Sequence, residues 1–131
     1  MNKILYAMIL VLCLAGYAAA EQEIFKPQDL PNAFAANAEA AKEQYLNKTV
    51  QLKGIVVGKG MSRYMTPNIE ISENGKAPVT AICVFPYSGI AYWNRMAQIE
   101  PFQPGQRVVI SGRVNSLSGE RVLLKESQLV E

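Results

Sequence analysis

From Thr49 onward, short runs of alternating apolar and polar residues restrict the fold more than any other feature of the chain. Val50 and Leu52 alternate with polar neighbours, and apolar residues again occupy every second position from Val108 to Val114. A period of two places the apolar side chains on one face of a β-strand. The sequence therefore predicts a mainly β fold whose strands each bury one face.

Five such strands are predicted, at residues 49–57, 69–72, 79–85, 107–114 and 121–125. Gly54 interrupts the first alternation, which predicts a bulge or a bend there. Asn74-Gly75 predicts an antiparallel hairpin between the second and third strands. Ser118-Gly119 predicts the turn before the last strand, which the sequence ESQLVE could extend.

Two segments have helical rather than strand periodicity. Residues 27–48 carry apolar side chains at steps of three and four, which predicts one amphipathic helix of about four turns with Asp29 or Asn32 at its start and Asn47 at its end. A shorter helix is predicted from Ser88, with Trp93 on its apolar side. A long N-terminal helix, five strands and a short helix between strands three and four predict an OB-fold, a five-stranded Greek-key barrel.

The first twenty residues, MNKILYAMILVLCLAGYAAA, have the pattern of a secretory signal peptide: Lys3, an apolar run, and small residues before a cleavage site between Ala20 and Glu21. The rival interpretation is a retained anchor, although the apolar run is short for a membrane-spanning helix. The sequence therefore predicts a signal peptide at 1–20, a flexible arm at 21–27 and one domain at 28–131. The expected location is the periplasm or the exterior.

Charge and residue types narrow the possible functions. Thirteen Lys and Arg face eleven Asp and Glu, a net charge of +2 with no long run of one sign, which is unlike a dedicated nucleic-acid-binding protein. The chain has no histidine, the commonest general base and zinc ligand, and we predict no metal and no other cofactor. Cys83 is the single cysteine after the leader, so no internal disulfide is expected.

Three segments resemble the tRNA-anti-like OB-fold family of small exported or membrane-associated bacterial proteins: AEAAKEQYLNKTVQLKGIV, the strand AICVF, and PGQRVVISGRV followed by VLLKESQLVE. The resemblance spans nearly all of the chain after the leader and implies the fold. It does not by itself imply nucleic-acid binding. The family often carries a further cysteine where this chain has Ser127, so the resemblance implies no disulfide here.

The first loop of the predicted barrel, residues 58–68, is the main candidate binding site. Lys59, Arg63 and Tyr64 could hold a phosphate and stack a base or sugar near the groove that OB-folds use for oligonucleotides and oligosaccharides. The alternative is a solvated loop with no ligand. Residues that would extend the same surface, if they share a face, are Lys53, Arg113 and Arg121.

Other reactive or aromatic residues favour structural roles. Cys83 lies in an apolar strand without a basic neighbour in sequence, which predicts a buried, inert thiol. Tyr87, Tyr92 and Trp93 fall in or before the short helix and are expected to pack into the core rather than to stack on bases. Glutamates Glu70 and Glu73 flank a hairpin without a partner for acid-base chemistry.

Three functional hypotheses follow. The first is a non-enzymatic, exported binding or adaptor module that holds an envelope protein or a small ligand. The second is weak binding of single-stranded nucleic acid, or of an oligosaccharide, through the first loop and the barrel groove. The third, a hydrolase that depends on glutamate, has no recognisable set of catalytic residues to support it.

Overall fold

The computed structural model describes residues 23–62, 66–86 and 97–130. The N-terminal elements are a two-residue strand and two helices: β1 (Ile24–Phe25), α2 (Asp29–Ala36) and α3 (Ala38–Tyr45). The other strands are β2 (Thr49–Met61), β3 (Pro67–Ser72), β4 (Ala81–Val84), β5 (Arg107–Leu117) and β6 (Val122–Leu129). The five predicted strands are therefore confirmed, and the last does extend through ESQL.

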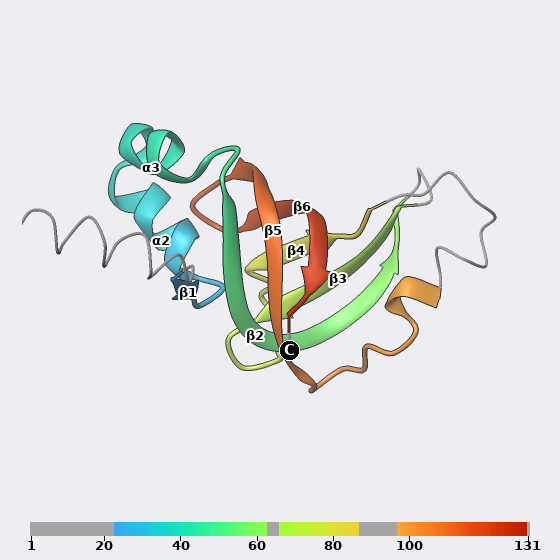
Figure 1. The fold of residues 1–131 in the computed structure, drawn as a ribbon. Coiled ribbons are helices and arrows are strands. Elements are labelled where there is room, and N and C mark those ends of the chain that lie inside the picture. Colours follow the sequence, from blue (N-terminus) through green and yellow to red (C-terminus); the bar gives the residue numbers. More distant parts are fainter. Residues whose placement is uncertain (1–22, 63–65, 87–96, 131) are drawn as a thin grey trace, which may run out of the picture.

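These five strands close into a barrel (Figure 1). Antiparallel pairs join β2 to β3, β3 to β4 and β5 to β6, while β4 and β6 pair in parallel. The barrel closes because the first half of β2, from Thr49 to Ile55, also pairs with β5. This order confirms the predicted OB-fold.

One long strand, β2, pairs with both β5 and β3, but its bulge is not at Gly54. The register of β2 against β3 shifts between Val56 and Gly58, which leaves Val57 as the extra residue. Gly54 has a different role. A Cβ there would collide with the side chain of Ile71 and would lie 2.7 Å from Pro27 Cγ, so only glycine fits without a shift of its neighbours.

The predicted single helix over residues 27–48 is instead two helices. Asn37 between them has extended backbone angles, φ −159° and ψ 99°, and its side-chain oxygen accepts a hydrogen bond from Ala40 N at the start of α3. The break therefore converts a mid-helix asparagine into an N-cap. Asn47 ends the helical region in the left-handed conformation, with φ 64°.

The segment expected to be a flexible arm is in part attached to the barrel. Ile24 and Phe25 pair in parallel with Gln51 and Leu52 of β2, and Pro27 is fully buried. Phe25 also packs edge-on against Tyr45 of α3, with ring centroids 5.6 Å apart. These contacts hold the chain in place from β1 onward.

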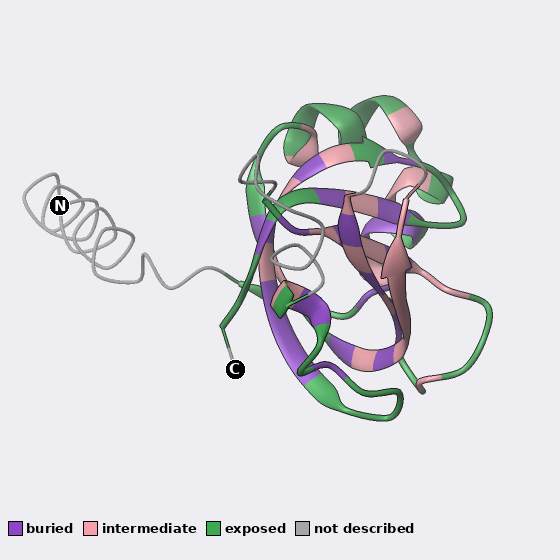
Figure 2. Cartoon of the chain, turned by 90° about the vertical axis from the view of Figure 1, so that its right-hand side faces the viewer, coloured by how far each residue is buried: buried purple, intermediate pink, exposed green. Residues whose placement is uncertain are grey.

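The barrel interior is apolar. Figure 2 shows buried and half-buried residues alternating along the strands. α2, which carries the fully buried Leu30, lies beside the barrel (Figure 1), and the rings of Phe85 and Phe102 lie 5.5 Å apart in the same core cluster, which also contains buried Ile99. The predicted short helix falls mostly on residues outside the described part of the chain, as does Trp93, and residues 97–99 are helical.

Both predicted turns form. Gly75 adopts φ 78° in the β3–β4 connection, where Asn74 Oδ1 accepts hydrogen bonds from Ser72 Oγ and Lys76 N. In the β5–β6 turn, Ser118 Oγ accepts hydrogen bonds from the backbone N–H groups of Glu120 and Arg121.

No helix within the described residues has the length and hydropathy that crossing a bilayer requires.

Ser127 is an exception in this apolar interior. It is 1% exposed, and its hydroxyl has no hydrogen-bond partner among the described residues. A buried hydroxyl without a partner costs free energy.

We expect Ser127→Ala to raise the free energy of unfolding by about 1 kcal/mol, measured by urea denaturation. Ser116→Ala, on the exposed part of β5, is the control and should change it by less than about 0.5 kcal/mol. Destabilisation by Ser127→Ala would show that the hydroxyl is satisfied after all.

Candidate functional site

Lys59 does not lie in a loop as predicted, because β2 continues through Met61. The bulge at Val57 shifts the alternation by one residue, so Lys59 stands opposite the buried Ile69. Its Nζ donates a hydrogen bond of 2.9 Å to the carbonyl oxygen of Glu100. Lys59 therefore links β2 to the segment that follows helical residues 97–99, and this amine is already engaged within the protein.

Arg63 and Tyr64, the other two residues of the predicted loop site, lie outside the described residues. The same holds for the aromatic residues Tyr87, Tyr92 and Trp93. Their assignment to binding or to the core stays a prediction.

Lys53 and Arg113 occupy the outer face of the β2–β5 pair. Their partners in the register are Val109 and Thr49, so they lie four residues apart along the pair. Arg113 is held locally, because its guanidinium donates to Asn47 Oδ1 at 3.4 Å and lies 3.5 Å from Glu126 Oε1. Lys53 is exposed and lines a pocket beside β1.

Arg121 is exposed in the β5–β6 turn. This turn lies near α2, where Gly119 approaches Ala35, while the C-terminal end of β2 lies on the opposite side of the barrel (Figure 1). Of the described members of the predicted set, Lys53 and Arg113 thus share the outer face of the β2–β5 pair, whereas Lys59 lies opposite the buried Ile69 and Arg121 lies in the β5–β6 turn. Their joint role in binding stays a prediction.

The outer surface of β3, β4 and β6 differs in composition from the sites of these cations. Most side chains that alternate with the buried ones on β3, β4 and β6 are half-buried, and these form what we call the β3–β4 face: Asn68, Glu70, Ile82, Val84 and Leu123. Lys125, the next residue of this alternation on β6, is exposed. The register places Asn68 opposite Val84, Glu70 opposite Ile82, and Ile82 beside Leu123. OB-folds commonly bind ligands on this part of the barrel.

The described side chains of the β3–β4 face are mostly apolar. Three are aliphatic, one is an amide and one is a carboxylate, and none of these five is an aromatic ring; one cation, the exposed Lys125, follows Leu123 in the alternation of β6. Single-stranded nucleic acid is usually held by cations along its backbone and by rings stacked on its bases. The face thus fits an apolar or peptide-like surface better than a phosphate chain. The alternation of side chains within NIEIS and AICV predicts which residues of β3 and β4 point outward and belong to this face.

Cys83 is fully buried on β4, as predicted. Burial raises the pKa of its thiol to about 12 because the interior penalises the thiolate. Since the thiolate is the reactive form, this position disfavours a catalytic or redox role.

We therefore expect a chain carrying Cys13→Ser to react slowly with a thiol reagent under native conditions. Raising the pH from 7 to 9 should accelerate the reaction of the urea-unfolded chain, whose thiol titrates near its ordinary pKa of about 8.5. In the native protein the Cys83 thiol stays protonated over this range. Rapid native labelling that follows the thiolate fraction would contradict its burial.

Among the residues that the structure describes, no group of three or more metal-ligating side chains comes together. Glu70 lies on the β3–β4 face, and Glu73 forms an ion pair of 3.8 Å with Lys26.

Comparison with known proteins agrees with this fold. A family model, described as tRNA_anti-like, matches residues 4–128. No curated protein matches the sequence. A solved structure from Klebsiella pneumoniae, provisionally described as a nucleic acid-binding lipoprotein, is 18% identical, with a TM-score of 0.61 over 87% of this chain and 96% of that chain.

An asparaginyl-tRNA synthetase from Entamoeba histolytica is also similar over 83% of this chain, at 11% identity. Its TM-score is 0.48, and the match covers 24% of the synthetase. At these identities the likeness concerns the fold alone.

Proposed function

Because this chain belongs to the tRNA_anti-like family, we propose that it is an exported, non-enzymatic binding or adaptor module with an OB-fold. Its ligand is a protein surface or other apolar component of the bacterial envelope, bound on the β3–β4 face. The family supplies a barrel whose known uses are mainly binding. The leader-like sequence of residues 1–20 supports export, and the lipoprotein description of the Klebsiella structure is consistent with an envelope location.

The observation that carries the proposal is the composition of the β3–β4 face. Ile82, Val84 and Leu123 are only half-buried, and they lie on the neighbouring strands β4 and β6, where Ile82 stands beside Leu123. Adjacent aliphatic side chains on a strand surface suit the apolar centre of a protein-protein contact, while Asn68 and Glu70 supply polar groups beside it.

Site-specific photocrosslinking in intact cells tests this proposal. A photoreactive residue at Ile82 or Leu123 should give one or a few discrete adducts of higher mass. The same residue at Glu43, exposed on α3, is the matched control and should give none. The Ile82→Asp variant of a chain labelled at Leu123 should lose the adduct while keeping its thermal unfolding midpoint. Equal labelling from Glu43 and Leu123 would count against this face as the site.

A second candidate function is binding of single-stranded nucleic acid through the first loop. The description of the Klebsiella structure, whose fold this chain shares, favours it. This function requires binding of a labelled oligonucleotide that weakens steeply as salt rises from 50 to 200 mM, and that Arg63→Ala and Tyr64→Ala abolish. Under the leading proposal, such binding is absent or unaffected by these variants.

A further inference from the structure

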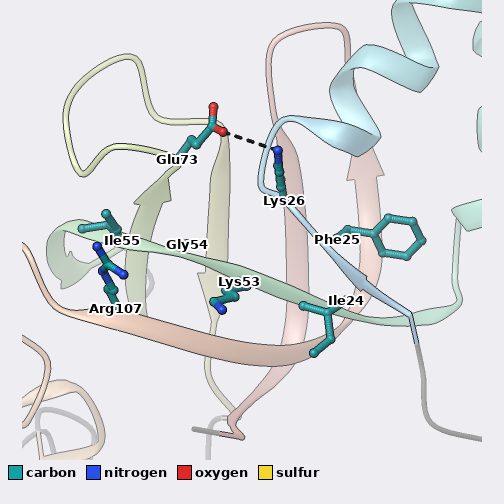
Figure 3. Close-up of a pocket in the computed structure, with 8 residues that line it drawn as sticks. All are labelled: Ile24, Phe25, Lys26, Lys53, Gly54, Ile55, Glu73 and Arg107. Atoms are coloured by element: carbon teal, nitrogen blue, oxygen red, sulfur yellow. Dashed lines mark ion pairs between the residues drawn. The ribbon is translucent and has the colours of Figure 1, made fainter.

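A pocket of about 580 Å³ lies between β1, β2 and β5, and none of its lining residues belongs to the β3–β4 face. Figure 3 shows its residues: Lys53 and Ile55 extend from β2, Arg107 from β5, and Ile24 and Lys26 from β1 and the residue after it. Pockets of this size commonly hold small ligands. Nothing in the family resemblance accounts for it.

The pocket brings two free cations together. Arg107 stands directly opposite Ile55 in the β2–β5 register, and Lys53 stands two residues before Ile55, so the two cations are diagonal neighbours. Diagonal neighbours have Cβ atoms roughly 7–8 Å apart, within the reach of long side chains to a shared anion. Neither Lys53 nor Arg107 has an ion-pair or hydrogen-bond partner for its side chain within the described part of the chain.

A third cation and the single carboxylate of the pocket lie at its rim. Lys26 Nζ is 3.8 Å from Glu73 Oε1, and both side chains are mainly exposed. This pair largely cancels its own charge, so the lining keeps an excess of two positive charges at Lys53 and Arg107. An anion placed between these two would relieve their mutual repulsion and gain two charge-assisted hydrogen bonds.

The rest of the pocket is apolar. Ile24 is 52% exposed, which is unusual for isoleucine in a strand, and Ile55 is half-buried beside Arg107. The aliphatic stem of Lys53 adds to the apolar area between them. Cations with adjoining aliphatic surface match a ligand that has a negative head and an apolar body.

We propose that this pocket binds an amphipathic anion, with its phosphate or carboxylate between Lys53 and Arg107 and its alkyl part against Ile24 and Ile55. The ligand is either a free single-chain amphiphile or an anionic lipid presented by a membrane, since the two share this chemistry. The site does not involve the β3–β4 face. Its existence is therefore independent of the proposed function, and failure of one leaves the other standing.

Hexyl phosphate is the probe, because it carries both features and stays monomeric at millimolar concentration. Titration of the protein, followed by the backbone amide NMR signals of Lys53, Gly54 and Arg107, should give saturable shifts with a Kd of about 1 mM or below. Inorganic phosphate and hexanol each carry one of the two features and should bind at least about tenfold more weakly. Saturation by inorganic phosphate at the same concentration as hexyl phosphate would overturn the proposal.

Variants of the pocket separate this site from general attraction of anions. Lys53→Gln and Arg107→Gln should each weaken hexyl phosphate binding about tenfold, whereas Lys125→Gln, an exposed cation on β6 outside the pocket, should not. Glu73→Gln should tighten binding severalfold, because it removes the one carboxylate and frees Lys26. Binding that all four variants leave unchanged, or that Lys125→Gln weakens equally, contradicts the assignment.

Co-sedimentation with phosphatidylglycerol vesicles identifies the source of the anion. If Lys53 and Arg107 are required for co-sedimentation, and phosphatidylcholine vesicles do not bind, the head group is presented by a membrane. Binding of hexyl phosphate without vesicle binding indicates a free amphiphile. Vesicle binding that Lys53→Gln and Arg107→Gln leave intact, together with no response to hexyl phosphate, would refute the site.

Discussion

Leu52→Ala is expected to lower the free energy of unfolding by about 3 kcal/mol. Leu52 is fully buried in β2, where it stands opposite Ile110 of β5 and Phe25 of β1. Removing its side chain forfeits the transfer free energy of the buried carbons and leaves a cavity that strands held on both sides cannot collapse to fill. A loss of this size is a large fraction of the 5–15 kcal/mol typical of one domain.

Urea denaturation followed by circular dichroism measures this effect through the midpoint of the transition. The matched control is Leu129→Ala, because Leu129 also lies in a strand but is 50% exposed, and its change should be below about 1 kcal/mol. Similar midpoints for the two variants would mean that Leu52 is not part of a closed core.

Gly54→Ala is expected to destabilise the protein by about 2 kcal/mol although it adds a single methyl group. That methyl would overlap the Cγ2 of the fully buried Ile71, would lie 2.7 Å from Pro27 Cγ, and would lie 3.1 Å from the carbonyl oxygen of Ser72. The backbone oxygen cannot rotate away, and both side chains are enclosed. The strand must therefore shift at the point where β2 passes from β5 to β3.

Two other glycines of the same strand provide the control. A Cβ at Gly58 or Gly60 would meet no atom within 4 Å, so Gly58→Ala and Gly60→Ala should change the unfolding free energy by less than about 1 kcal/mol. Thermal unfolding of the three variants under identical conditions compares them directly. A Gly54→Ala protein as stable as the Gly58→Ala protein would show that Pro27 does not pack against β2.

The strands and their order could be predicted because each strand buries one face, and the alternation records which one. The position of the bulge could not. Glycine is the usual indication of a bulge, yet the extra residue is Val57, and Gly54 is required instead by the close approach of Ile71 and Pro27. These are contacts between residues distant in sequence, and a local pattern does not contain them.

The helix break and β1 escaped prediction for related reasons. Asn37 lies in an alanine-rich run with high helix propensity, and its role as the N-cap of α3 depends on a chain direction set by packing on the barrel. β1 contains two residues and pairs in parallel with β2, so it has no periodicity to detect.

The two candidate sites also differ in how far the sequence predicts them. Outward positions on β3 and β4 follow from alternation, so the members of the β3–β4 face could be read from the sequence. The pairing of Lys53 with Arg107 could not, because it depends on the register between β2 and β5. Lys59 was predicted in a loop because the local pattern does not show that β2 continues through Met61 past the bulge.

Closure of the barrel through β2 and β5 has a consequence for how the chain folds. The β3–β4 and β5–β6 hairpins join neighbouring segments, whereas the closing pair joins Thr49–Ile55 to residues from the other half of the chain. The entropy of such a large loop is lost before its contacts form, which slows acquisition of the native state to milliseconds or longer, as for other barrels rich in distant pairings. Until that step, the apolar face of β2 is exposed to other chains. Refolding at high protein concentration should therefore give a lower yield of folded protein, because more of it aggregates, than refolding at low concentration.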